Sequence, residues 1–283
     1  MTLHANVSDA VCLVTGANTG IGRHTALELA GGGARVLLAC RSREKTAPVV
    51  EELREKTGNP RVDLLELDLG SLESVRRCAT AFYEQHDRLD LLVNNAGVAG
   101  HRGATADGFE LQFGTNHIGH FALTCLLRPA LLASPAPRVV TVASRGHYRP
   151  TTIDFDAVRR PTATMAGFHE YCVSKLANVL FTQELARRTA GRLGAYALHP
   201  GVVASDIWRR VPWPLRKLVT LFMVTNEEGA QTTLYCATSP EVADHSGRYY
   251  DRSREKRPSR HATPELAAEL WRRSVEWTGT DWG

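Results

Sequence analysis

Short apolar runs alternate with longer amphipathic stretches along almost the whole chain. A strand that is apolar at nearly every position suits a sheet covered on both faces. The segments between the runs are long enough for helices, so the pattern predicts an α/β fold with a doubly wound, mostly parallel sheet of about seven strands and helices on both faces. The candidate strands are Ala10–Thr15, Arg35–Cys40, Val62–Leu67, Leu89–Asn94, Arg138–Ser144, Ala195–His199 and Gly247–Tyr250.

Helix-ending and helix-starting residues support this pattern. Gly31–Gly33 follow an expected helix over Ile21–Ala30 and can provide its left-handed C-terminal turn. Thr263 and Pro264 fit the N-cap and first position of a helix over Glu265–Val275. Because no repeat, low-complexity segment or long linker divides the chain, we expect a single domain over residues 1–283.

Composition narrows the class of protein. Of the 283 residues, 43% are hydrophobic and 23% are charged, which is typical of a soluble globular protein and excludes a disordered chain or a collagen-like fibre. The net charge of +4 is too weak to indicate a nucleic acid partner. No two of the six cysteines have metal-binding spacing, and no secretory signal opens the chain, so we expect free thiols and a cytoplasmic location.

A glycine-rich segment follows the first expected strand and opens the first expected helix. It reads Thr15-Gly16-Ala17-Asn18-Thr19-Gly20-Ile21-Gly22. Glycines let the backbone turn tightly and approach a pyrophosphate, and a helix N-terminus attracts negative charge. The spacing differs from the commoner G-x-G-x-x-G, and a plain glycine-rich turn is the alternative, but the placement favours a dinucleotide site.

The ends of the next strands carry further candidates for cofactor binding. Cys40 stands where an acid would bind the ribose 2′-hydroxyl of NAD, and the following Arg41 can accommodate the 2′-phosphate of NADP, unless it only ends a strand in solvent. Asp68 and Leu69 end the third strand, where an adenine would lie. Asn94–Gly97 ends the fourth strand with residues small enough to admit a cofactor, although an ordinary Asn/Gly turn has the same composition.

Tyr171 and Lys175 are four residues apart on an expected helix and therefore share one face. A nearby ammonium group favours the phenolate and lowers the pKa of a tyrosine, which suits acid–base work. The chain has only five lysines, and chance predicts roughly 0.1 such pairs, so the spacing is moderate evidence. Upstream, Ser144 ends the fifth strand, where its hydroxyl could polarise a substrate carbonyl.

Together these residues resemble the short-chain dehydrogenase/reductase family, whose members have a Rossmann fold, and the resemblance covers nearly the whole chain. It implies an NADP(H) site and a catalytic set. The residues implied to bind the cofactor are Gly16, Asn18, Thr19, Gly20, Ile21, Gly22, Arg41, Asp68, Leu69, Asn95, Ala96, Gly97, Tyr171, Lys175, Pro200, Gly201, Val203 and Ser205. The residues implied to be catalytic are Asn116, Ser144, Tyr171 and Lys175.

The resemblance also implies a role for each catalytic residue. Tyr171 gives or takes the hydroxyl proton, and Ser144 orients the carbonyl. Lys175 lowers the pKa of the tyrosine and holds the nicotinamide ribose, and Asn116 positions Lys175 through a water molecule. The hydride transfer itself belongs to the chemistry of the cofactor.

Finer detail resembles the retinol-dehydrogenase-like branch, which includes NADP-dependent reductases of retinoids and other apolar carbonyls and is related to light-dependent protochlorophyllide reductases. Two features depart from the branch. The chain begins almost at its first strand, where membrane-bound relatives often carry a hydrophobic anchor, and Ser205 stands where threonine is more usual. The segments that carry the resemblance are Ala39–Ser42, Asn116–Phe121, Ser174–Phe181 and His199–Val203.

We therefore expect an NADP(H)-dependent oxidoreductase that interconverts an alcohol and a carbonyl on a small apolar substrate, retinoid-like or another hydrophobic aldehyde or ketone. Reduction is the expected direction with cytosolic NADPH. No nucleic acid partner, metal site or transmembrane anchor is expected, whereas peripheral membrane contact and a homo-oligomer stay open. Two alternatives also stay open: a non-catalytic NADP-sensing or scaffold protein on the same fold, and light-driven ring reduction.

Three other features allow both structural and functional interpretations. His117 and His120 are interpreted as packing residues or as residues around the cofactor, in preference to metal ligands. The basic stretch Arg252–Arg260 is interpreted as a solvated loop, in preference to a site for an anionic partner. Ala204–Asn226, which Pro212–Pro214 interrupts, is interpreted as a substrate lid, with a membrane-touching surface and plain core as the alternatives.

Overall fold

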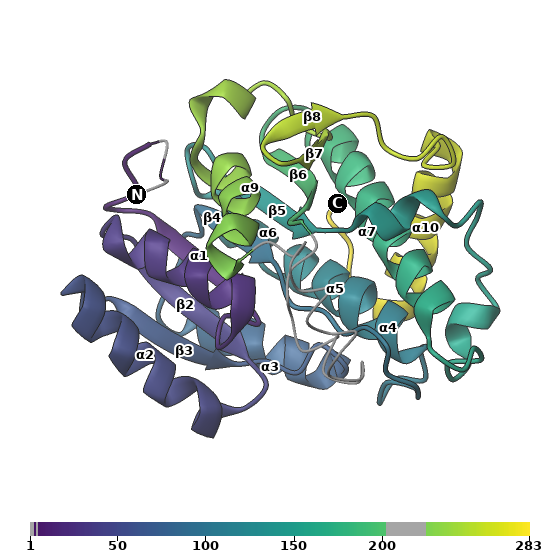
Figure 1. The fold of residues 1–283 in the computed structure, drawn as a ribbon, viewed down its shortest axis with the longest axis horizontal. Coiled ribbons are helices and arrows are strands. Elements are labelled where there is room, and N and C mark those ends of the chain that lie inside the picture. Colours follow the sequence, from purple (N-terminus) through teal and green to yellow (C-terminus); the bar gives the residue numbers. More distant parts are fainter. Residues whose placement is uncertain (1–2, 4, 202–224) are drawn as a thin grey trace, which may run out of the picture.

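The sheet expected from the hydrophobic pattern is present in the computed structural model, which describes residue 3, residues 5–201 and residues 225–283 (Figure 1). Its strand order is β3-β2-β1-β4-β5-β6-β7-β8. The first seven strands run parallel, and β8 pairs antiparallel with β7. The strands are β1 (Val11–Thr15), β2 (Arg35–Cys40), β3 (Val62–Glu66), β4 (Leu91–Asn94), β5 (Arg138–Val142), β6 (Gly194–His199), β7 (Tyr249–Asp251) and β8 (Arg254–Lys256).

Helices connect the parallel strands, as crossover connections require. The α-helices are α1 (Gly20–Gly31), α2 (Arg43–Thr57), α3 (Leu72–Tyr83), α4 (Leu111–Phe113), α5 (Gly119–Leu126), α6 (Arg128–Leu132), α7 (Phe168–Thr189), α9 (Asn226–Thr238) and α10 (Pro264–Thr278). A π-helical turn, Gly114–Ile118, joins α4 to α5. Short 3-10 turns cover Arg145–Tyr148, Ala157–Arg159 and Pro240–Val242.

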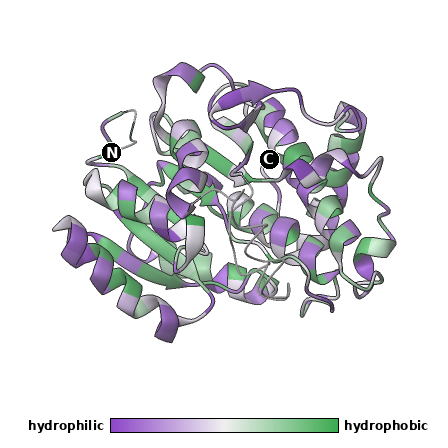
Figure 2. Ribbon diagram, in the orientation of Figure 1, coloured by the Kyte–Doolittle hydropathy of each residue, from purple (hydrophilic) through white to green (hydrophobic). Residues whose placement is uncertain are grey.

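Two apolar layers cover the sheet, one on each face. Successive residues of a strand point to opposite faces. In β1, Leu13 packs with α3, α5, α7 and α10, whereas its neighbours Cys12 and Val14 pack with α1, α2 and α9. Figure 2 shows the result as strands that are mostly apolar between helices whose outer faces are polar. Burial on both faces therefore explains the continuously apolar runs in the sequence.

The eighth strand is a correction to the sequence-based expectation. The seven expected strands lie within two residues of β1–β7 at both ends, but β8 lies in the basic stretch for which a solvated loop is expected. Arg252 and Ser253 form the two-residue turn of the β7–β8 hairpin, and both have positive φ, 53° and 56°. Such turns usually contain Asn or Gly, so these residues gave no hairpin signal. All three side chains of β8 are exposed.

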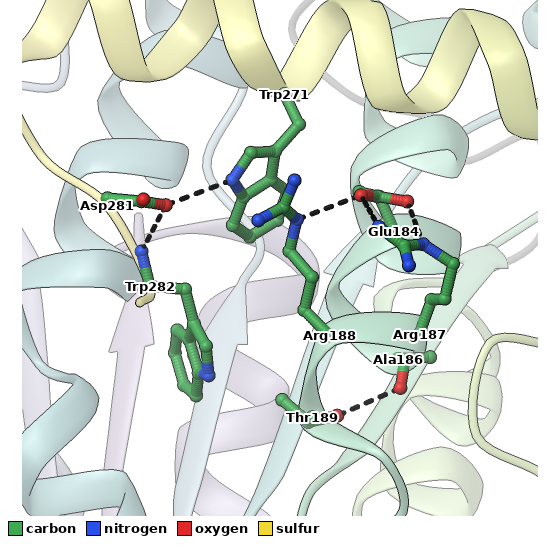
Figure 3. Close-up of polar contacts among 8 residues, drawn as sticks. All are labelled: Glu184, Ala186, Arg187, Arg188, Thr189, Trp271, Asp281 and Trp282. Atoms are coloured by element: carbon green, nitrogen blue, oxygen red, sulfur yellow. Dashed lines mark hydrogen bonds and ion pairs between the residues drawn. The ribbon is translucent and has the colours of Figure 1, made fainter.

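The C-terminal helix packs on α7 through aromatic and charged side chains (Figure 3). Trp271 of α10 stacks on Phe181, with ring centroids 5.9 Å apart, and meets Phe121 edge-on. The guanidinium of Arg188 lies 4.7 Å from the centroid of the Trp271 ring, and the indole N–H donates to Asp281. Because α7 carries Tyr171 and Lys175, this packing fixes the helix on which the expected acid–base pair lies.

The expected helix ends are present with one difference. Thr263 caps α10 by accepting a hydrogen bond from the Leu266 amide, and Pro264 is the first helical residue, as predicted. At the end of α1, Gly32 keeps right-handed geometry and Gly33 takes the left-handed conformation, with φ of 85°. The left-handed turn therefore comes at the last of the three glycines.

The proposed lid cannot be compared with the structure over most of its length. Residues 204–224 lie outside the described residues, and only Thr225 and Asn226 remain. Thr225 caps α9 and exchanges hydrogen bonds with Glu228 in a capping box. Among the described residues, no helix combines the length and the apolar character that a membrane crossing needs.

Candidate active site

The N-terminus of α1 is open to a ligand. Its N-cap residue, Thr19, makes no side-chain hydrogen bond to the first turn. The side chains of Ser42, Ser71 and Thr263, in contrast, cap α2, α3 and α10. Because the first backbone N–H groups of a helix have no partner within the helix, those of α1 are available to an anion such as a pyrophosphate.

The glycine-rich loop between β1 and α1 packs directly on the segment after β4. Gly16 has φ of 64°, and a Cβ atom there would lie 2.9 Å from the Cβ atom of Ala96. A Cβ atom at Gly22 would lie 2.6 Å from the carbonyl oxygen of Gly16 and would also meet the Asn95 side chain. Larger side chains do not fit, so these glycines make the cradle that a dinucleotide requires.

The Thr15 hydroxyl joins β1 to the segment after β4. Its oxygen accepts hydrogen bonds from the backbone N–H groups of Asn95 and Ala96, both at 2.9 Å. The Asn95 side chain donates in return to the Thr15 carbonyl at 2.8 Å. Thr15 is fully buried, so these bonds are shielded from water and fix the two cofactor-facing segments relative to each other.

The end of β2 carries a thiol and a guanidinium group. Cys40 is buried close to the backbone amides of the glycine-rich loop. Burial raises the pKa of the Cys40 thiol, so it stays neutral. Arg41 is exposed at the strand end. This edge of the site therefore carries a positive charge and no carboxylate at the position expected for one.

The end of β3 places Asp68 beside the same edge. One carboxylate oxygen of Asp68 accepts a hydrogen bond from the Gly70 amide at 2.9 Å, which leaves the other oxygen for a ligand. Leu69 is buried in the core. Its side chain is thus occupied by packing, and only its backbone could contact an adenine.

Lys175 is held in the interior by the backbone of the neighbouring strand. Its ammonium nitrogen donates to the Val142 carbonyl at 2.8 Å, and the residue is only 4% exposed. Burial lowers the pKa of Lys175 to about 8. The side chain of Asn116 pairs with both backbone polar groups of Val98 and donates to the Ser174 hydroxyl at 2.9 Å.

Gly97 lies where these two groups come together. A Cβ atom at Gly97 would stand 3.2 Å from the Asn116 side-chain oxygen and 3.4 Å from the Lys175 nitrogen. The absence of a side chain therefore lets the segment after β4 touch both residues. Three stretches far apart in the sequence meet at this point.

Tyr171 and Ser144 lie next to each other, close to Lys175. A Cβ atom at Gly146 would stand 3.5 Å from the Tyr171 ring and 3.6 Å from the Ser144 hydroxyl oxygen, which accepts from the Gly146 amide at 3.1 Å. Burial raises the pKa of Tyr171, and the neighbouring Ser144 side chain opposes that rise only in part. The direction differs from the lowering expected from Lys175, because burial dominates; the Lys175 ammonium group donates to the Val142 carbonyl and lies 5.7 Å from the Tyr171 ring centroid.

Four further residues are expected to bind the cofactor, and the structure describes two of them. Pro200 and Gly201 follow β6 directly, and Gly201 has φ of 95°. Val203 and Ser205 lie outside the described residues. The carboxyl ends of the parallel strands β1, β4, β5 and β6 lie at one edge of the sheet. In open α/β sheets this edge is the usual ligand crevice.

The two histidines after Asn116 contact different parts of the fold. His117 lies 3.0 Å from the Ser274 hydroxyl of α10, and His120 lies between Thr15 and the Asn116 backbone. Among the described residues, no group of three or more His, Cys, Asp or Glu is arranged to hold a metal ion. His117 is therefore a packing residue, whereas His120 neighbours the cofactor segments, and only its spacing from Asn116 indicated this in the sequence.

Comparison with known proteins decides the family. Residues 10–153 match the family model described as short chain dehydrogenase. The chain belongs to the short-chain dehydrogenase/reductase family. It is 41% identical to human retinol dehydrogenase 13 over 288 residues, which cover 98% of this chain and 87% of the relative. It is 43% identical to human retinol dehydrogenase 12, with 96% and 87% covered. These relatives place it in the retinol-dehydrogenase-like branch, and it is an oxidoreductase of this family.

Solved structures agree. An uncharacterised protein from Mycobacterium paratuberculosis has a TM-score of 0.80 at 34% identity, covering 99% of this chain and 97% of its own. A short-chain dehydrogenase from Shigella flexneri complexed with NADP has a TM-score of 0.72 at 25% identity, covering 89% of this chain and all of its own (100%). The fold is therefore that of dehydrogenases with a Rossmann sheet.

The buried ammonium of Lys175 makes stability depend on pH. Its pKa of about 8 in the folded protein is below the ordinary value, so the unfolded chain binds its proton more tightly. Lys175→Met should therefore be more stable than the wild type at pH 7, by roughly 2–4 kcal/mol, with the gap closing as the pH rises from 8 to about 10.4.

Urea unfolding of both proteins across this pH range measures the gap. Lys45→Met, which replaces an exposed lysine, is the control and should show no pH-dependent gap. A difference between Lys175→Met and the wild type that stays constant from pH 7 to 10 would contradict the prediction.

Proposed function

We propose that the protein is an NADP(H)-dependent oxidoreductase that interconverts an alcohol and a carbonyl on a small apolar substrate, with carbonyl reduction as its main direction. The observation that carries this proposal is the juxtaposition of Tyr171 and Ser144 at the strand ends, next to the buried Lys175. A phenol and a hydroxyl that lie side by side can both reach one substrate oxygen. Such a pair suits proton transfer to a carbonyl.

Each residue of the site has its own role in the proposed reaction. The Tyr171 hydroxyl is the proton donor, and its raised pKa keeps it protonated at neutral pH. The Ser144 hydroxyl orients the substrate oxygen, and the Lys175 ammonium group supplies positive charge beside the phenol. Asn116 holds the backbone of Val98 and thereby the segment after β4. The nicotinamide cofactor, when bound, supplies or accepts the hydride.

The preference for NADP(H) rests on the end of β2. Cys40 is buried and offers no carboxylate to a ribose 2′-hydroxyl. Arg41 is exposed and close in sequence to Arg43, the first residue of α2, which is also exposed. Positive charge there suits a 2′-phosphate. The Shigella flexneri relative complexed with NADP supports the same cofactor.

The preference for an apolar substrate rests on the exposed ring of Phe168 beside Tyr171. Phe168 is 51% exposed, one turn before Tyr171 on α7, and their rings stack with centroids 6.4 Å apart. Met165 and Tyr148 are also exposed, on the segment that connects β5 to α7. Exposed large apolar side chains next to a site can bind an apolar ligand. The names of the retinol dehydrogenase relatives support a retinoid-like or similar apolar aldehyde.

The first prediction from the proposed function concerns proton transfer. Tyr171→Phe keeps the ring and its stacking on Phe168 but removes the hydroxyl that donates the proton. Turnover should fall by roughly a hundredfold to ten-thousandfold, because general acid catalysis contributes about that factor. NADPH binding should stay nearly normal. The measurement is NADPH oxidation with a panel of apolar aldehydes and ketones, carried out in darkness, with NADPH fluorescence titration as the binding control.

Two outcomes would contradict this prediction. One is a Tyr171→Phe enzyme that keeps more than about a tenth of the wild-type turnover with chemistry rate-limiting, which reopens the non-catalytic alternative. The other is a wild-type enzyme that requires light for turnover, which favours ring reduction over dark carbonyl reduction.

The second prediction concerns the cofactor. Arg41→Ala should weaken NADPH binding about tenfold or more and leave NADH binding almost unchanged, because charge-assisted hydrogen bonds to a phosphate are worth roughly 1.5–3 kcal/mol. Fluorescence titration of both cofactors measures this, with NADH as the internal control. Equal losses for NADPH and NADH would overturn the assignment of Arg41 to the 2′-phosphate.

A further inference from the structure

His120 joins two parts of the site through its two ring nitrogens. It lies on α5 and is 1% exposed. Its Nδ1 atom is 3.0 Å from the backbone carbonyl oxygen of Asn116, and its Nε2 atom is 2.9 Å from the Thr15 hydroxyl oxygen. Both distances are those of ordinary hydrogen bonds.

The partners fix which nitrogen carries the hydrogen. A carbonyl oxygen can only accept, so Nδ1 of His120 donates to Asn116. Nε2 then has a free lone pair, and the Thr15 hydroxyl donates to it. The other acceptor near this hydroxyl, the Val93 carbonyl, is farther away at 3.3 Å. Donation to Val93 would leave Nε2 buried without a partner, so the bond to His120 is favoured.

The imidazole of His120 stays neutral in this place. Burial lowers its pKa to about 4, and the nearby Lys175 charge acts in the same direction. The Thr15 oxygen already accepts from the amides of Asn95 and Ala96, so it has no capacity for a third donor from a protonated ring. The two hydrogen bonds of His120 are therefore complete only in the neutral ring with hydrogen on Nδ1.

The resulting chain of hydrogen bonds connects the cofactor side to the acid–base side. On one side, Thr15 holds the amides of Asn95 and Ala96. On the other side, the Asn116 side chain holds Val98 and touches Ser174 of α7. Among the described residues, His120 is thus the one side chain that makes hydrogen bonds to both Thr15 and Asn116.

We propose that His120 is a positioning residue of the reaction, which sets the Asn116 backbone and the cofactor-facing segment after β4 in one arrangement. The inference rests on the proposed function. Each of its two bonds has its own effect: the bond to Thr15 orients the segment that faces the cofactor, and the bond to Asn116 orients the backbone beside Lys175. Loss of the first bond weakens NADPH binding, and loss of the second lowers turnover.

Two substitutions separate these bonds. In His120→Asn the side-chain amide can take the place of Nδ1, so the donor to Asn116 is kept and the acceptor for Thr15 is lost. In His120→Gln the side-chain oxygen can reach the place of Nε2, so the acceptor for Thr15 is kept and the donor to Asn116 is lost. His117→Gln is the matched control, because His117 is equally buried on the preceding turn but contacts Ser274 of α10.

The experiment measures kcat for carbonyl reduction and the Kd for NADPH in each variant, with unfolding by urea as a check on stability. We expect His120→Asn to weaken NADPH binding about tenfold more than His120→Gln does, since one buried hydrogen bond is worth roughly 1–1.5 kcal/mol. We expect His120→Gln to lose kcat by about tenfold relative to His120→Asn. His117→Gln should change neither quantity beyond about twofold, whatever it does to stability.

The result decides between positioning and plain packing. Equal changes in kcat and Kd for the two His120 variants, or changes that His117→Gln reproduces at the same loss of stability, would overturn the proposal. If the wild type binds NADPH but reduces no carbonyl, the proposed function fails, but the Kd values still test the role of His120. Weaker NADPH binding by His120→Asn than by His120→Gln supports positioning, and equal Kd values overturn it.

Discussion

The site depends on the hydrogen bonds of the Thr15 hydroxyl. A parallel sheet brings strand ends to one edge, but it does not by itself fix the loops that follow them. The Thr15 oxygen does so by accepting the amides of Asn95 and Ala96 and donating to His120. With these bonds in place, the glycine-rich loop can pack against the segment after β4 without a gap, and the N-terminus of α1 faces the same crevice.

A second constraint is the burial of charge next to Tyr171 and Ser144, the proposed reacting groups. Lys175 is almost completely buried and donates to the Val142 carbonyl. Its lowered pKa shows that the fold does not fully compensate for the loss of water around the ammonium group. A protein selected only for stability would place an apolar side chain there. The cost in stability is therefore an argument for function, because a buried positive charge beside Tyr171 suits chemistry at that phenol and the binding of a cofactor.

Much of the fold could be predicted from the sequence, because strands buried on both faces leave continuous apolar runs and helix ends leave capping residues. The β7–β8 turn could not, because its left-handed residues are Arg252 and Ser253 rather than Asn or Gly. Within the site, spacing located Tyr171 and Lys175, but it gave the wrong direction for the pKa of Tyr171. Burial decides that direction, and burial depends on tertiary packing. The role of His120 likewise depends on a contact with a residue 105 positions away.

The most direct test of this account is the NADPH affinity of Thr15→Val compared with Thr15→Ser. Valine keeps the shape of threonine but removes the hydroxyl, whereas serine keeps the hydroxyl and loses only a methyl group. The account predicts that Thr15→Val binds NADPH at least about tenfold more weakly than Thr15→Ser, because the amides of Asn95 and Ala96 and the His120 ring lose their shared partner. Equal NADPH affinities in the two variants would contradict it.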